Sequence, residues 1–261
     1  ALGLVLACAP PAAGASVVPA YGDWSIGAVQ LKATCNAAIA RAQKLVTALL
    51  AIHGRRTFAN TILPLEDLSS DLNDTTVAQQ FLFNVTTDKG IQDASQTCNE
   101  AQSAFFTDIT ASPQLYSAVA AAARSNTVRG VYQNKLTSIW IDTLKRSGAG
   151  LAGKGRMEFV RLSKELTTLE NDFASNLQND STTISITPAQ AAALPADFTS
   201  GLKMAGGGYI VPVNESTVSL FLQNQKDEAA RQAYYLAYNN RQAAANTPLL
   251  ERAIAIRDRL A

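Results

Sequence analysis

Histidine is nearly missing from this sequence of 261 residues, which contains His53 alone, and its scarcity excludes several kinds of active site. The HExxH zinc motif needs two imidazoles one helical turn apart, so this chain does not contain it. A Ser-His-Asp triad needs one histidine, but the GxSxG sequence that often carries its serine is missing as well. His53 falls at the end of an expected helix, where an imidazolium interacts well with the last carbonyl groups. We therefore predict a structural role for His53 and expect neither catalytic nor metal-binding residues in this chain.

The chain also lacks an excess of charge of either sign. Its 22 basic and 21 acidic residues give a net charge of +1, without a long run of one sign. Nucleic acids and anionic membranes require a basic surface, which this composition does not supply. Hydrophobic residues make up 47% of the chain and charged residues 16%, so a sizeable core is expected. Aromatic residues are few and alanine is abundant, which favours helices over strands.

Residues 1–15, ALGLVLACAPPAAGA, differ from the rest of the chain. They resemble the apolar part and the cleavage region of a secretory signal, and they are too short and too rich in proline to span a membrane. Because no initiator Met or basic segment precedes them, we expect a partial signal peptide, cleaved before Ser16. Residues 16–261 would then form a secreted or periplasmic protein. The alternative is a lipoprotein site, with Cys8 lipidated, but simple cleavage is the preferred interpretation.

Cysteine is scarce too, and its spacing is informative. If Cys8 leaves with the signal, Cys35 and Cys98 remain as a pair. In an oxidising compartment such a pair indicates a disulfide, although two buried free thiols remain an alternative. No CxxC or Cys/His spacing suggests a metal site.

The periodicity of apolar residues predicts an all-α fold, an elongated bundle of several helices. Ser112 before Pro113 and Thr187 before Pro188 are helix N-caps, and Thr247 before Pro248 is expected to be another. A short β-strand or hairpin is expected at most near 208–213, after a cluster of glycines. The expected helices run over about 25–54, 58–84, 91–107, 113–124, 128–146, 159–177, 188–195, 226–243 and 248–260.

Several stretches, in their order along the chain, resemble segments of the thimet oligopeptidase and peptidyl-dipeptidase family of zinc peptidases. Together they extend from about Ala33 to Leu260. They are RTFANT at 56–61 with PLE at 64–66, RSGAGL at 146–151, LTTLENDFASNL at 166–177, GYIV at 208–211, and the pattern of Arg231, Tyr234, Tyr238, Arg241, Asn246, Leu249 and Leu250.

The resemblance implies an enzyme that cuts short peptides inside a channel between two helical halves. In that family an HExxH helix provides two zinc ligands and the general base, and a further glutamate is the third ligand. Zinc lowers the pKa of a bound water, which attacks the peptide carbonyl. None of these positions has a counterpart in this sequence, so no catalytic or metal-binding residue can be assigned. We expect this chain to be the N-terminal channel wall, truncated before the catalytic half, and inactive and free of zinc by itself.

Two other interpretations remain open: a secreted helical module that binds peptides or proteins without catalysis, and an unrelated periplasmic bundle. The peptidase interpretation predicts that the last helices lack their natural partner. Part of their apolar surface should then pack on the helix at 159–177 and part should be exposed. The side chains concerned are Tyr234, Tyr235, Tyr238, Leu249, Leu250, Ile254 and Ile256.

Overall fold

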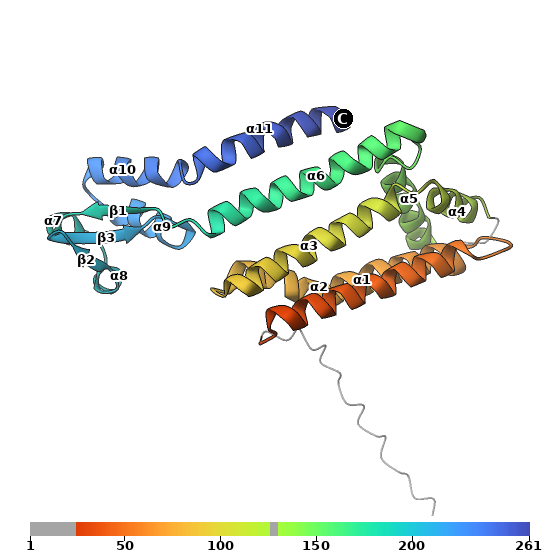
Figure 1. The fold of residues 1–261 in the computed structure, drawn as a ribbon, viewed down its shortest axis with the longest axis horizontal. Coiled ribbons are helices and arrows are strands. Elements are labelled where there is room, and N and C mark those ends of the chain that lie inside the picture. The colour runs from red at the N-terminus through yellow and green to blue at the C-terminus, as the bar shows by residue number, and fades with distance from the viewer. Residues whose placement is uncertain (1–24, 126–129) are drawn as a thin grey trace, which may run out of the picture.

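The structure, a computed structural model, describes residues 25–125 and 130–261, and it is mainly helical (Figure 1). The strands in this part of the chain form one small antiparallel sheet that includes 208–212. The predicted fold class, an elongated helical bundle with little β-structure, is therefore confirmed. Within the described residues, no helix combines the length and the apolar character that crossing a membrane requires.

A bundle of long helices makes up the first part of the fold. Helices α1, α2 and α3 lie side by side, α4 and α5 cover one end, and α6 lies against α3 (Figure 1). The elements are α1 (Ala28–Leu50), the π-helical turn η1 (Phe58–Ile62), α2 (Leu63–Val85), α3 (Lys89–Thr110), α4 (Pro113–Arg124), α5 (Val131–Arg146) and α6 (Gly153–Gln178).

A small sheet unit follows α6, and the last helix returns along α6 toward the bundle (Figure 1). The strand order is β1-β3-β2, with both pairs antiparallel. The elements are β1 (Thr183–Ile186), α7 (Pro188–Ala191), α8 (Ala196–Ser200), β2 (Lys203–Ala205), β3 (Gly208–Pro212), α9 (Glu215–Asn224), α10 (Glu228–Asn239) and α11 (Ala243–Leu260).

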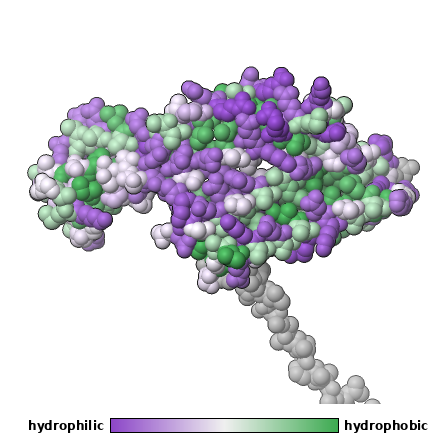
Figure 2. All heavy atoms as spheres, in the orientation of Figure 1, coloured by the Kyte–Doolittle hydropathy of each residue, from purple (hydrophilic) through white to green (hydrophobic). Residues whose placement is uncertain are grey.

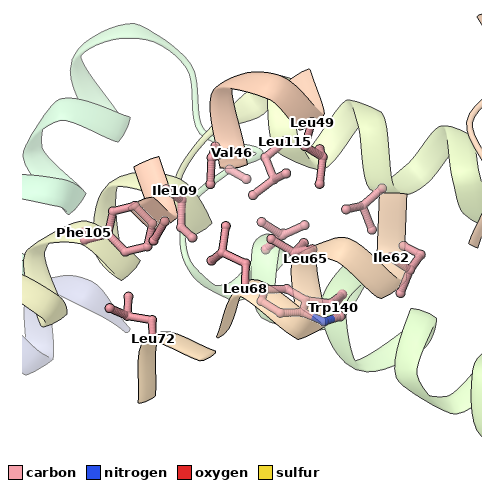
Figure 3. Packing of buried hydrophobic residues seen from close by; sticks show 14 of the residues in the cluster. Val46, Leu49, Ile62, Leu65, Leu68, Leu72, Phe105, Ile109, Leu115 and Trp140 are labelled. Atoms are coloured by element: carbon pink, nitrogen blue, oxygen red, sulfur yellow. The ribbon is translucent and has the colours of Figure 1, made fainter. Parts of the chain in front are cut away.

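The main core lies between α1, α2, α3, α4 and α5. Leucines 65, 68 and 72 of α2 recur at spacings of three and four, so they share one face of that helix, and all are buried. Figure 3 shows this face packed with side chains from the neighbouring helices, and the labelled residues are Val46, Leu49, Ile62, Leu65, Leu68, Leu72, Phe105, Ile109, Leu115 and Trp140. Removing one buried leucine side chain from such a core costs about 2–5 kcal/mol.

The sheet unit has a separate core. The Phe221 ring stacks on the Tyr234 ring with centroids 4.4 Å apart, and both side chains are fully buried beside Val211. At the edge of this core, β1 and β3 approach closely at Gly208. A Cβ atom added there would lie 2.4 Å from the carbonyl oxygen of Ile186, so a glycine is required.

Some elements were not predicted from the sequence and several helix boundaries differ, since the helix expected at 159–177 begins at Gly153 and the one expected at 226–243 ends at Asn239. Neither β1 nor α9 was predicted, although residues 183–186 alternate polar and apolar and Asn214 caps α9 with hydrogen bonds to the backbone of Ser216 and Thr217. Pro248 was expected to begin the last helix, which was wrong, because α11 begins at Ala243 and contains Pro248. The alanines at 243–245 favour helix strongly enough to extend it.

Candidate functional site

The predicted cysteine pair is joined in the structure. Cys35 of α1 and Cys98 of α3 form a disulfide with their Cα atoms 5.8 Å apart, and both residues are buried. The bridge joins residues 63 positions apart in the sequence and links α1 to α3. Cys8, the alternative lipidation site, lies outside the described residues.

The role predicted for His53 is filled by another residue. His53 is exposed, three residues beyond the end of α1. The carbonyl oxygens of Leu49 and Leu50 instead accept hydrogen bonds from the Arg56 guanidinium, at 2.7 and 3.1 Å. Arg56 therefore caps the C-terminus of α1, as a cation at that end of a helix should.

The rest of the segment at 56–66 also has a structural role. The Thr57 backbone donates to Asn60 Oδ1 at 2.8 Å, and the Asn60 backbone donates to Thr57 Oγ1 at 3.2 Å, a reciprocal cap for η1. Further on, Glu66 accepts a hydrogen bond from the indole of Trp140 at 2.8 Å, which links α2 to α5. The hydrogen bonds of these residues position helices.

The turn at 146–151 brings α6 back along the bundle. Gly148 has a φ of +80°, a left-handed conformation that favours glycine, and a Cβ atom there would lie 2.9 Å from the Phe159 ring. The backbone N–H of Ala149 donates to the carbonyl of Leu144 at 3.1 Å, so the end of α5 is closed within this turn.

Tyr238 and Arg241 of the segment at 231–246 link α10 and the turn that follows it to α9 within the sheet unit. Tyr238 donates to Glu215 at 2.6 Å, and Arg241 donates to the same carboxylate at 3.0 Å while lying 4.1 Å from the centroid of the Tyr238 ring. The hydrogen bond from Tyr238, with that from Arg241, lowers the pKa of Glu215, and the same bond raises the pKa of Tyr238. The carboxylate therefore stays ionised near neutral pH and keeps the contact strong.

A second group of polar contacts lies at the C-terminal end of α6. Gln242, with a φ of 54°, donates to Asp180 at 2.7 Å. Burial would raise the pKa of Asp180, but the hydrogen bonds from Gln242 and Thr182 outweigh it, and the pKa is lowered. Asn246, almost fully buried, accepts from Asn176 at 2.8 Å. Polar contacts therefore fix the two places where the chain passes between the bundle and the sheet unit, after α6 and before α11.

The α6–α11 pair is the surface that the peptidase interpretation singled out. The two helices are antiparallel neighbours (Figure 1). Ion pairs join them along the interface at Arg252–Glu165 (2.6 Å), Arg257–Glu170 (2.6 Å) and Arg259–Glu158 (3.2 Å).

These ion pairs shift the titration of their members. The hydrogen bond from Arg259 lowers the pKa of Glu158, and the bond from Arg252 lowers the pKa of Glu165. The same bonds raise the pKa of both arginines. All four groups lie at the surface and are screened by solvent and salt, so they fix the register of the two helices more than they stabilise the fold.

The apolar side chains of α10 and α11 are only partly covered. Tyr234 and Ile256 are buried, Tyr238 and Leu249 are half-buried, and Tyr235, Leu250 and Ile254 are exposed. A hollow of about 240 Å³ lies between α6 and α11, with Leu169 and Phe173 of α6 on one wall and Leu250 and Ile254 of α11 on the other. Part of this surface packs on α6 and part faces solvent. Tyr235, Leu250 and Ile254 have exposed fractions of 56%, 50% and 59%, and Leu236 of α10 is exposed as well, at 51%.

The exposed apolar side chains of α10 and α11 form a candidate binding surface. The described residues contain no group of three or more His, Cys, Asp or Glu side chains that could hold a metal ion. Sequence periodicity predicted that α11 is apolar, but it did not show which of its side chains α6 would cover. The sequence analysis also missed the ion pairs with α6, because they join residues about 90 positions apart.

No protein-family model matches this sequence, and a search of curated proteins finds no match either. The similarity to zinc oligopeptidases therefore rests on the residue patterns alone. Most of the residues in those patterns that we can place have structural roles in this fold.

Proposed function

We propose that this chain is the N-terminal channel wall of a secreted zinc oligopeptidase of the thimet oligopeptidase and peptidyl-dipeptidase family. In this proposal a catalytic half bearing HExxH docks on α10 and α11. The observation that supports it is the partly covered apolar surface of these helices. Tyr235, Leu250 and Ile254 are exposed although their helix neighbours Tyr234 and Ile256 are fully buried. Leu250 and Ile254 are one helical turn apart on α11 and line the same hollow, and an exposed apolar patch of this kind is typical of an interface.

The two halves of the proposed enzyme would have different roles. The catalytic half would provide zinc, its ligands and the general base, since the described residues of this chain hold no suitable cluster. This chain would enclose the peptide and exclude bulk water, which strengthens electrostatic interactions around the reacting bond. A rigid wall suits that task, and the disulfide and the core between α1, α2 and α3 provide it.

The test begins with the coding sequence that follows the codon for Ala261. The proposal expects an open reading frame with HExxH, whose full-length product hydrolyses a fluorogenic peptide. Activity should disappear with a chelator and return with zinc. A stop codon directly after Ala261, or a full-length product without such activity, would contradict the proposal and favour the binding module.

A further inference from the structure

A groove runs along the interface between α3 and α6. In the described part of the chain it contains two hollows, of about 400 and 340 Å³. In the lining of the larger hollow, Asn99 donates a hydrogen bond to Asn171 at 2.9 Å. Hydrophilic residues dominate the surface where these two helices lie side by side (Figure 2). The volume of the larger hollow lies in the range of small-ligand sites.

The groove has an apolar end. The larger hollow is bordered by α2 as well as by α3 and α6, and most of its lining is apolar. Val77, with an exposed fraction of 59%, and the half-buried Phe83 contribute from α2, and Ala174 contributes from α6. An apolar side chain of a ligand would lose contact with water here.

Two carboxylates lie next to this hollow, hydrogen-bonded to Gln96 and Asn171 of its lining, and one of them, Glu100, lines the second hollow. Gln96 donates to Glu100 at 3.3 Å and to Asp172 at 3.5 Å, and Asn171 donates to Glu100 at 3.5 Å. These bonds are at the long end of hydrogen-bonding distance and come from neutral amides. Among the described residues, no lysine or arginine lies within 4.0 Å of either carboxylate. Lys164, which lines the second hollow, is already paired with Asp108 at 2.7 Å.

Two half-buried carboxylates without a cation attract one, and the attraction is stronger there than in open water. We propose that the α3–α6 groove binds a short cationic peptide. Its positive group lies at Glu100 and Asp172, and an apolar side chain of the same peptide lies against Val77 and Phe83. The amides of Gln96 and Asn171 can exchange their long bonds for shorter ones to the peptide backbone.

Short cationic peptides would then be the substrates of the proposed oligopeptidase. Only this biological role rests on the proposed function; the binding itself does not. Binding requires no catalysis and can be measured on this chain as it is. A failure to bind would leave the search for HExxH untouched, and a missing HExxH would leave the groove as the ligand site of a binding module.

The test compares two doubly substituted chains. Glu100→Gln with Asp172→Asn removes both charges but keeps acceptor oxygens for Gln96 and Asn171. Glu251→Gln with Asp258→Asn makes the same change in charge on α11, where both residues are exposed. Circular dichroism and thermal unfolding of each variant check that the fold is retained.

The probe is a fluorescein-labelled, N-acetylated hexapeptide with one arginine and one phenylalanine, and its affinity is measured by fluorescence anisotropy at low salt. We expect binding to weaken about tenfold or more in the groove variant and to stay unchanged in the control. A peptide with citrulline in place of arginine should lose affinity for the unsubstituted chain by a similar factor. A peptide with a free amino terminus and no arginine shows whether the α-amine can also serve as the cation, and its binding would support the same site. Equal affinity of the two variants, equal affinity of the arginine and citrulline peptides, or no binding by the unsubstituted chain would overturn the proposal.

Discussion

In the bundle, α2 buries Leu65, Leu68 and Leu72 against α1 and α3, whereas α6 buries Leu162 alone, although the whole of α6 lies in the described part of the chain. Helix α6 is instead joined to α3 by amides and carboxylates and to α11 by ion pairs. Apolar packing withstands salt and pH, whereas exposed polar contacts do not. The bundle therefore provides most of the apolar packing, whereas α6 and α11 leave more of their side chains at the surface.

The largest expected effect concerns the disulfide of the bundle. Replacing both Cys35 and Cys98 with alanine should reduce the free energy of unfolding by about 4 kcal/mol in the chain-entropy model, because the bridge closes a long loop. Denaturant unfolding of both proteins measures the loss. Dithiothreitol should destabilise the unsubstituted chain and leave the double variant unchanged. If the double variant is as stable as the unsubstituted chain, the bundle does not depend on this bridge.

A core substitution should have the next largest effect. Leu65→Ala should destabilise the chain by about 2–5 kcal/mol, because Leu65 is fully buried and the substitution leaves a cavity. Leu45→Ala is the matched control, because Leu45 is half-exposed and the change should cost less than about 0.5 kcal/mol. Similar losses for the two variants, measured by urea unfolding, would show that the bundle core is not where the structure places it.

The smallest effect should arise from the α6–α11 layer. Glu158 and Glu165 have a pKa below the ordinary value of 4.5. Their contribution to stability is therefore complete above about pH 4.5 and is lost as the pH falls through the lower, folded-state pKa. The protection of the α11 amides against hydrogen exchange, taken relative to the intrinsic rate at each pH, should decrease over that range, and also in high salt at neutral pH. The amides of α2 should not respond to salt. If the exchange protection of the α11 amides responds to neither pH nor salt, then apolar contacts, and not ion pairs, hold α11 on α6.

Sequence predicted the elements whose signals are local. Ser112 caps α4 as expected, with its side chain accepting from the Leu115 backbone, because a cap depends on four neighbouring residues. The buried face of α1 was harder to identify. Val29 and Leu45 fit the expected apolar pattern, yet both are exposed. In an alanine-rich helix several faces are apolar, and packing decides which one is buried.

The candidate site was harder to predict from the sequence than the helices were, because its residues come together only in the tertiary structure. The alternation of residues 183–186 is too short to distinguish a strand from a loop, and β1 becomes one only by pairing with β3. The carboxylates of the α3–α6 groove, Glu100 and Asp172, belong to different helices. No local sequence pattern predicts that these two carboxylates lie close together. Arg56 took the capping role predicted for His53, because the chain turns back toward α1 after Gly54.

We propose that α10 and α11 present a surface for a catalytic half. Hydrogen exchange of these helices, measured in this chain and in the product of the complete coding sequence, tests it most directly. We predict that amides of α11 exchange at least about tenfold more slowly in the complete product, because Leu250 and Ile254 are then covered, while amides of α2 exchange equally in both. Equal exchange of α11 in the two proteins, or a coding sequence that stops at Ala261, would contradict the account.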